Sequence, residues 1–381
     1  MDLNETPEQR AFRMRLREWL SANAPNRIAA GDFTDEHEAR VEWHRRLHAA
    51  GYAALSWPTE YSGQGLGPIE EAIFAQEAGR FGVPSDLGYG FIARAMLLFA
   101  SEEQRQRYLP PLLAGTEFWC QGFSEPDAGS DLASLRTRAR VDPSGGPDGG
   151  FVVSGQKTWT SNAQWADYCL CLVRTGEPES RSKGISTLII DMRQPGIEVR
   201  PIRTIRGDEE FCEVFFDEVQ VPRSCLVGEL DEGWRYAMVT LTYERGPVDI
   251  GFVTKYFALL DRLRTVLQDQ GEHIDSGRRR ALARAAVGVE VLRVQTLKSL
   301  SRRLERPPGP EGSIDKLLMA RVEQQLLTAA VGVVGGACLV DDDEEDWFSN
   351  YLYSRAATIY GGTEQVQKNV LADQCLGLPR S

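Results

Sequence analysis

The hydrophobic period of this chain changes twice, and these changes limit the folds that the chain can adopt. From residue 7 to about 115, apolar residues recur at spacings of three and four, the pattern of amphipathic helices. Near Phe118 the period becomes two, and from Asp231 onward the helical period returns. A βαβ nucleotide-binding fold would alternate strands and helices throughout. The order of helices, strands and helices excludes such a fold.

The two changes of period predict three consecutive domains in an α+β protein. Residues 1–116 are expected to form an all-α domain, residues 117–229 a β domain and residues 230–381 a helical bundle. Five short segments rich in Val, Ile, Phe and Thr are the expected strands of the β domain. They are FVVSGQKTW, DYCLCLVRT, STLIIDM, IEVRPIRTI and CEVFFDEVQV.

Composition and charge exclude several classes of function. The net charge is −12 and the basic residues are spread along the chain, so nucleic acid is not an expected partner. The longest uncharged stretch, residues 326–340, is shorter than the roughly 20 residues of a membrane span. The charged helical start does not resemble a secretory signal, so we expect a cytoplasmic protein.

No metal site is expected. His44 and His48 have the i, i+4 spacing of a metal pair, but the sequence around them offers no third ligand. Both are interpreted as surface histidines of a helix. The seven cysteines include no Cys-x-x-Cys pair, which indicates free thiols in a reducing compartment.

Two motifs at the β domain have residue types suited to a planar polar ligand. CQGFSEPDAGSD, residues 120–131, predicts a turn whose backbone N–H groups could face such a ligand, or a plain capped turn. GQKTWTSNAQWAD, residues 155–167, places Trp159 beside the hydroxyls of Thr160 and Ser161. This Trp could stack near a heterocycle or fill the core of the sheet. Both interpretations of each motif stay open.

Glu244 lies on the apolar stripe of a predicted helix, in register with Ala237, Leu241, Val248 and Phe252. A poorly hydrated carboxylate there would be a strong base, unless a cation or backbone donor stabilises its charge. A catalytic base and a buried ion pair are therefore the two candidate roles.

Near the C-terminus, IYGGTEQ places two glycines before a short helical pattern. Free amides there could meet a carbonyl or phosphate oxygen, although a plain left-handed turn would use the same residues.

In this order, the motifs resemble those of the acyl-CoA dehydrogenase family along almost the whole chain. The resemblance implies a helical N-terminal domain, a central β domain and a C-terminal four-helix bundle, with FAD between the last two. It implies electron-transfer flavoprotein as the electron acceptor. The motif positions that match cofactor-binding residues of the family are Gln121, Phe123, Ser124, Ser130, Trp159, Thr160, Ser161, Thr363 and Gln365; Ser130 and Arg245 also match substrate-binding positions.

The resemblance also assigns the catalytic groups. In much of the family the base is a Glu directly before Gly-Thr, but this chain has Gly361 there. A subset of the family has its base on the earlier long helix, before an Arg, and Glu244-Arg245 matches that arrangement. Glu244 is thus expected to remove the α-proton of an acyl thioester while the β-hydride passes to flavin N5. The backbone N–H of Gly361 is expected to polarise the thioester carbonyl.

Two departures from the family pattern concern contacts between subunits. LQDQGEHIDSG stands where many members have Arg-x-x-Phe-Gly, and Gly332 replaces the Gln of Gln-x-x-Gly-Gly. The expected assembly is therefore a homo-oligomer or a heterotetramer with a related subunit. Three functions stay open: dehydrogenation of an acyl-CoA, perhaps a bulky one; desaturation of an acyl group on a carrier protein; and a non-catalytic role in a heteromer.

Overall fold

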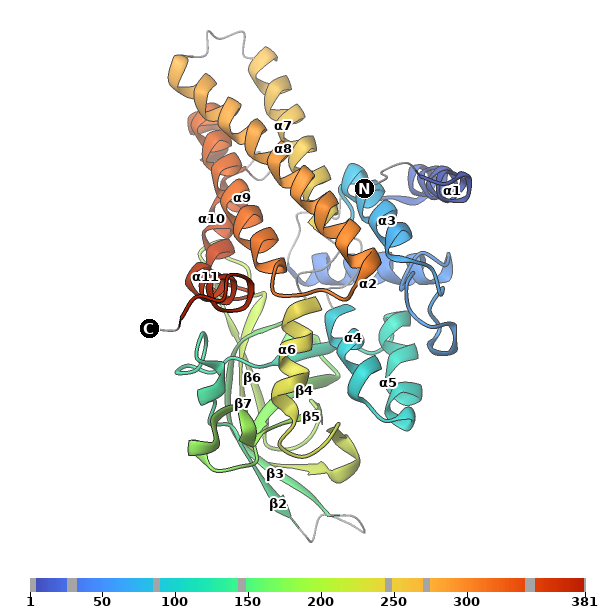
Figure 1. Cartoon of the computed structure of the whole chain (residues 1–381), viewed down its shortest axis with the longest axis vertical. Helices are drawn as coiled ribbons and strands as arrows, with labels where there is room; N and C mark the ends of the chain where they lie inside the picture. Colours follow the sequence, from blue (N-terminus) through green and yellow to red (C-terminus); the bar gives the residue numbers. More distant parts are fainter. Residues whose placement is uncertain are drawn as a thin grey trace. The chain divides into compact units, whose positions relative to one another are not determined.

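The computed structural model describes residues 5–25, 33–84, 90–142, 149–243, 249–269, 275–339 and 347–379 (Figure 1). The N-terminal helices are α1 (Pro7–Asn23), α2 (Phe33–Ala49), α3 (Pro68–Phe81), α4 (Gly90–Phe99) and α5 (Glu102–Ala114). The strands are β1 (Trp119–Gly122), β2 (Arg138–Asp142), β3 (Gly150–Ser161), β4 (Tyr168–Arg174), β5 (Ile185–Asp191), β6 (Ile197–Ile202), β7 (Phe211–Pro222) and β8 (Leu226–Val227). The later helices are α6 (Gly233–Tyr243), α7 (Asp249–Asp269), α8 (Ser276–Glu305), α9 (Gly312–Val334), α10 (Trp347–Ser354) and α11 (Glu364–Val370). The predicted order of helices, strands and helices is confirmed.

These elements form two compact units. The sheet unit contains residues 33–65, 90–142 and 149–243 of the described chain, and the helical unit contains the remaining described residues. The N-terminal helices are divided between them: α1 and α3 belong to the helical unit, whereas α2, α4 and α5 belong to the sheet unit. The domain boundaries after residues 116 and 229 describe the order along the chain and stay a prediction.

The sheet has the order β6-β7-β3-β2-β4-β5-β8, and β1 pairs in parallel with β4. All five predicted strand segments are strands. Every residue of β4 lies at 0–7 % exposure, and β4 pairs with neighbours along both edges. A long, antiparallel β3–β7 pair has two register shifts, one of them between Lys157 and Thr160. That shift positions the first candidate site.

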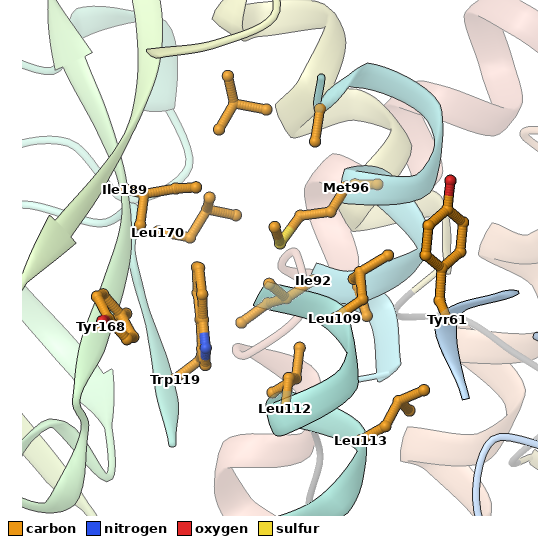
Figure 2. Close-up of a cluster of buried hydrophobic side chains, with 14 of the residues drawn as sticks. Tyr61, Ile92, Met96, Leu109, Leu112, Leu113, Trp119, Tyr168, Leu170 and Ile189 are labelled. Atoms are coloured by element: carbon orange, nitrogen blue, oxygen red, sulfur yellow. The ribbon is translucent and has the colours of Figure 1, made fainter. Parts of the chain in front are cut away.

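Apolar side chains from α4 and α5 pack against residues of β1, β4 and β5 in the sheet unit (Figure 2). Ile92 and Met96 of α4 and Leu109 of α5 contact a cluster that includes Trp119 of β1 and Leu170 of β4. Each such side chain contributes about 1.5–3 kcal/mol when it leaves water. These helices therefore cover one face of β1 and β4, which includes Trp119 and Leu170, and hold the start of β1 in place.

The helical unit is built around α7, α8 and α9, with a core that includes Leu263, Leu292 and Leu326. Helix α9 is long and apolar enough to cross a membrane, alone among the described helices. Core helices of globular proteins have the same composition, and Leu326 is fully buried among its neighbours. Helices α3 and α7 approach closely: a Cβ added at Gly79 would lie 2.8 Å from the carbonyl oxygen of Gly251. A larger residue at position 79 would force these helices apart.

Candidate functional site

Trp159 lies on a bulge of β3 that turns its side chain out of the sheet. Its φ of 57° is unusual for a residue with a Cβ, and it coincides with the register shift between Lys157 and Thr160. The side chain is 60 % exposed and makes an edge contact with Phe211, with ring centroids 5.9 Å apart. The alternative that this Trp fills the core of the sheet is wrong. The indole is available to a ligand.

Two buried oxygen atoms near this bulge have no hydrogen-bond partner within the described chain. They are Oγ1 of Thr160, whose residue is 1 % exposed, and Oε1 of Gln121 on β1. An unpaired buried polar atom costs about 1–3 kcal/mol, and such atoms in native proteins are usually paired by water or a ligand. A flat heterocycle with polar edges would pair these oxygens and lie beside the exposed indole.

A hydrogen bond joins the first candidate motif to the second. The backbone N–H of Thr158 donates to the carbonyl of Ser124 at 3.0 Å. Phe123, the preceding residue, is buried in an apolar cluster. The structure therefore brings the predicted residues Gln121, Phe123 and Ser124 next to the bulge of β3.

Beyond Ser124 the chain makes the tight turn that both interpretations of the motif predicted. Glu125 and Ala128 exchange two backbone hydrogen bonds, of 3.1 and 3.0 Å. Ser130, which follows the turn, is exposed, as is Ser161 at the end of β3. Both hydroxyls are accessible to a ligand, unlike the buried oxygens of Gln121 and Thr160.

A buried ion pair under this turn was missed by the sequence analysis. Lys157 Nζ lies 2.8 Å from Glu125 Oε1 and donates to the carbonyl of Phe123 at 3.1 Å. The carboxylate also accepts from the backbone N–H groups of Arg136 and Thr137, at 2.6 and 2.9 Å. Burial opposes the charge of Glu125, but Lys157 and these donors outweigh it and hold the pKa of the carboxyl below its usual value. The pair ties the loop after β1 to β3.

The sequence contained a signal for this pair. Phe151, Val153 and Lys157 fall on alternate positions of one strand, so Lys157 occupies a position that should face inward. A lysine is almost never fully buried unless it is paired. The signal predicts a buried acidic partner without identifying it.

In the helical unit, Gly361 and Gly362 form the predicted left-handed turn, with φ values of 60° and 88°. The hydroxyl of Thr363 caps α11 by accepting from the N–H of Val366 at 3.2 Å. Gln365 is exposed. Gln367, which the sequence analysis did not select, is fully buried and donates through Nε2 to the carbonyls of Gly361 and Gly362, at 2.9 and 3.3 Å.

A cavity of about 60 Å³ lies beside this turn. Its lining mixes polar and apolar residues and includes Lys316, Arg321, Gln324, Gly362 and Gln367. The ammonium of Lys316 also lies 4.0 Å from the centroid of the Tyr360 ring, directly before the turn. Lys316 therefore contacts both the cavity and the residue before the turn.

Replacing Gln367 with Met should loosen the turn, because two backbone carbonyls would lose their donor. We expect a loss of about 1–3 kcal/mol in the free energy of unfolding, and faster amide hydrogen exchange at residues 361–363. Gln365→Met is the matched control, since this side chain is exposed and the expected change is below about 0.5 kcal/mol. Equal effects of the two variants would show that the hydrogen bonds of Gln367 do not hold the turn.

Two predicted residues, Glu244 and Arg245, lie outside the described residues. Of the predicted stripe around Glu244, Ala237 is buried on α6 and Phe252 is partly exposed on α7. Among the described residues, no group of three or more His, Cys, Asp or Glu side chains is placed to hold a metal. His44 is buried, with Nε2 2.7 Å from the carbonyl oxygen of Leu113, so the expectation of a surface histidine was wrong there.

Three family models together match nearly the whole chain. They are the acyl-CoA dehydrogenase N-terminal domain at residues 6–116, the middle domain at 120–219 and the C-terminal domain at 231–376. The chain belongs to the acyl-CoA dehydrogenase family. The resemblance inferred from the motifs and the fold class that it implied are both confirmed.

Relatives of the chain include full-length enzymes and heteromeric complexes. Acyl-CoA dehydrogenase IpdE1 of Mycolicibacterium smegmatis is 37% identical over an alignment of 390 positions, gaps included, which covers 98% of each chain. The Tcur3481-Tcur3483 steroid acyl-CoA dehydrogenase is 28% identical, with a TM-score of 0.86 and full coverage of both chains. The ChsE4-ChsE5 complex from Mycobacterium tuberculosis is also 28% identical, with a TM-score of 0.83 and full coverage of both chains. The chain is therefore an oxidoreductase of a flavoprotein family.

Proposed function

We propose that this chain catalyses the FAD-dependent α,β-dehydrogenation of a bulky acyl-CoA thioester. The proposal is supported most by two buried oxygens, on Gln121 and Thr160, that have no hydrogen-bond partner within the described chain. They lie near the exposed indole of Trp159. When bound, the flavin would accept the β-hydride at N5, which no side chain can do. Phe123 and Ser124 would position the polar edge of the cofactor, held in place by Lys157 and Glu125.

The chain's own residues would perform the proton chemistry. Gly361 has no side chain to act as a base, which supports the assignment of that role to Glu244. The α-proton of a thioester is weakly acidic, so its removal needs a carboxylate and hydrogen bonds to the carbonyl oxygen. The backbone N–H of Gly361 is the proposed donor, and Gln367 holds the turn that contains it. Arg245 and Ser130 are proposed to contact the substrate.

A bulky acyl group is favoured over a short one by the comparisons. The Tcur3481-Tcur3483 enzyme, which matches this chain over its full length, is described as a steroid acyl-CoA dehydrogenase. The absence of a glutamate side chain at position 361 also leaves more room beside the thioester. We therefore infer a substrate whose acyl chain ends in a large ring system.

A visible absorption spectrum of the purified chain tests the proposal. We expect bound flavin, and bleaching of its absorbance when a steroid side-chain acyl-CoA is added without oxygen. Butyryl-CoA at the same concentration is the matched comparison and should bleach the flavin far more slowly. A flavin-containing protein that no acyl-CoA reduces would contradict the proposed reaction. Faster bleaching by butyryl-CoA would contradict the proposed substrate class.

Replacing Trp159 with Ala should separate cofactor binding from folding. The exposed indole contributes little to the core, so we expect the free energy of unfolding to change by less than about 0.5 kcal/mol. Loss of the stacking surface should weaken flavin binding by about tenfold, because a lost aromatic contact is worth about 0.5–1.5 kcal/mol beyond its buried area. Equilibrium dialysis against FAD measures the affinity. Unchanged affinity would remove Trp159 from the flavin site.

We also propose that the working enzyme is an assembly with a related, non-identical chain. Two of the solved structures that match this chain over its full length are complexes of two differently named chains. Gly332 stands where many members have an interface Gln, and a Cβ added there would meet no atom within 4 Å. The packing of this chain therefore leaves room for a larger residue, and the glycine is not needed to fit the fold.

A further inference from the structure

Helix α8 has an exposed apolar stripe on the side away from the core of its unit. Val287, Val291 and Val294 are 64 %, 50 % and 54 % exposed. Val289 and Leu292, between them in sequence, are buried in the core of the helical unit. Isolated exposed valines are ordinary on a protein surface, but three in a row on one helix indicate a surface for binding.

The stripe belongs to a longer seam with the spacing of paired helices. Residues 280, 284, 287, 291, 294 and 298 follow one another at steps of four and three, which is the heptad pattern of helices that pack along their length. They lie within about 80° of one another around the helix. The seam is apolar in its centre, with Arg280 and Arg284 on one side and Lys298 on the other.

The charge of α8 differs from that of the whole protein. The chain has a net charge of −12, yet α8 has eight Arg or Lys residues and two Glu residues. Within the described part of the chain, the ion pairs of α8 involve Arg278, Arg293 and Arg302 and leave Arg284 and Lys298 unpaired, while Arg280 is attracted to the carboxylate of Asp275. The charges at both ends of the seam are therefore available to a partner.

A second copy of this chain fits the seam poorly. In an antiparallel pair centred on Val291, Arg284 of one copy would face Lys298 of the other, since both lie seven residues from the centre. In a parallel pair each basic residue would face its own counterpart. Like charges in such positions destabilise a helix pair. Two copies that paired along this seam would therefore place like charges opposite each other in both the antiparallel and the parallel orientation.

We infer that the α8 seam binds a related but non-identical subunit whose facing helix has acidic residues at both ends of an apolar stretch. The inference rests on the proposed assembly with a related chain and specifies the chemistry of that partner. The valines would supply the desolvated centre of the contact, and the acidic residues would pair with Arg280, Arg284 and Lys298.

Two synthetic peptides test the inference on the full chain. One has the native α8 sequence, and the other has the substitutions Arg280→Glu, Arg284→Glu and Lys298→Glu, so that its seam is acidic. Fluorescence anisotropy with labelled peptides measures their binding. We expect the acidic peptide to bind at least about tenfold more tightly than the native one, because its three acidic residues can form several ion pairs with the seam. Equal affinities would overturn the charge argument.

Variants of the full chain show whether the seam is responsible. Arg284→Glu with Lys298→Glu should reverse the preference between the peptides. Arg279→Glu, about 80° away from Val287 around the helix, adds acidic charge outside the seam and should leave the preference intact. The same effect from both variants would mean non-specific attraction and overturn the inference. Tighter binding of an acyl carrier protein than of the acidic peptide would assign the surface to substrate delivery instead.

The mass of the chain in sedimentation equilibrium gives an independent check. We expect Val291→Glu to leave that mass unchanged, because the seam should be free in the purified chain. A lower mass would show that copies of this chain pair along α8. None of these measurements depends on flavin or turnover, so their failure is distinguishable from a failure of the proposed reaction.

Discussion

Glu244→Gln is expected to lower turnover by about 10²–10⁴-fold, the usual contribution of a positioned general base. Glutamine has nearly the same shape as glutamate but cannot accept the α-proton as a carboxylate does. Flavin content and the thermal unfolding midpoint should remain close to those of the wild type. Reduction of the flavin by acyl-CoA in single-turnover absorbance measurements is the direct readout. Activity close to wild type would show that another group removes the proton.

Two further variants sharpen this test. Glu232→Gln makes the same chemical change at an exposed site in a surface ion pair with Arg235, and it should leave turnover unchanged. Glu244→Gln combined with Gly361→Glu places a carboxylate where much of the family has its base. We expect the double variant to regain part of the lost activity. The left-handed φ of 60° at Gly361 should cost a residue with a Cβ about 1–2 kcal/mol of stability.

The order of secondary structure could be predicted because each segment has a clear hydrophobic period. The strand segments around Phe151, Leu170 and Ile189 were all found where the period of two predicted them. The grouping of the N-terminal helices into two units could not be predicted. A helical period shows that one face is buried, but it does not show which element covers that face. Helix α3 contacts α7 in the helical unit, whereas α4 packs in the sheet unit.

At the candidate site, residue types were predictable but their directions were not. A strand alternates its side chains, and the bulge before Thr160 inserts a residue and breaks that alternation. Trp159 is therefore exposed, while Thr160 is buried with an unpaired hydroxyl. Gln367 was not selected because its role depends on a turn several residues earlier. Its two hydrogen bonds are visible once the fold is known.

Lys157→Met is expected to lower the free energy of unfolding by about 3–5 kcal/mol, because it leaves the buried carboxylate of Glu125 without its cation. The backbone donors of Arg136 and Thr137 would remain, but they do not neutralise the charge. Urea denaturation followed by circular dichroism measures the change. Arg140→Met is the matched control: its pair with Glu218 is more than half exposed on both sides, so the expected loss is below about 1 kcal/mol.

The double variant Glu125→Gln with Lys157→Met identifies the cause. Glutamine can still accept a backbone hydrogen bond and has no charge to leave unpaired, so the double variant should be more stable than Lys157→Met alone. Such a result would be a coupling between the two residues, as expected for groups in direct contact. A double variant less stable than the single one would mean that the lysine acts through packing alone.

The difference in unfolding free energy between the wild type and Lys157→Met should change with pH in a predictable direction. In the wild type the pKa of Glu125 lies below its ordinary value of 4.5, so the pair's stabilisation is present above that value and is lost as the pH falls through the lower, folded-state pKa. In Lys157→Met the buried carboxyl has lost its cation, so its pKa should be higher than in the wild type. Protonation of Glu125 at low pH would then stabilise the variant by removing an unpaired buried charge, whereas in the wild type it would weaken the ion pair. The stability difference between the two proteins should therefore shrink as the pH falls toward about 4. If the difference stays constant between about pH 7 and 4, the charge of Glu125 is not its source.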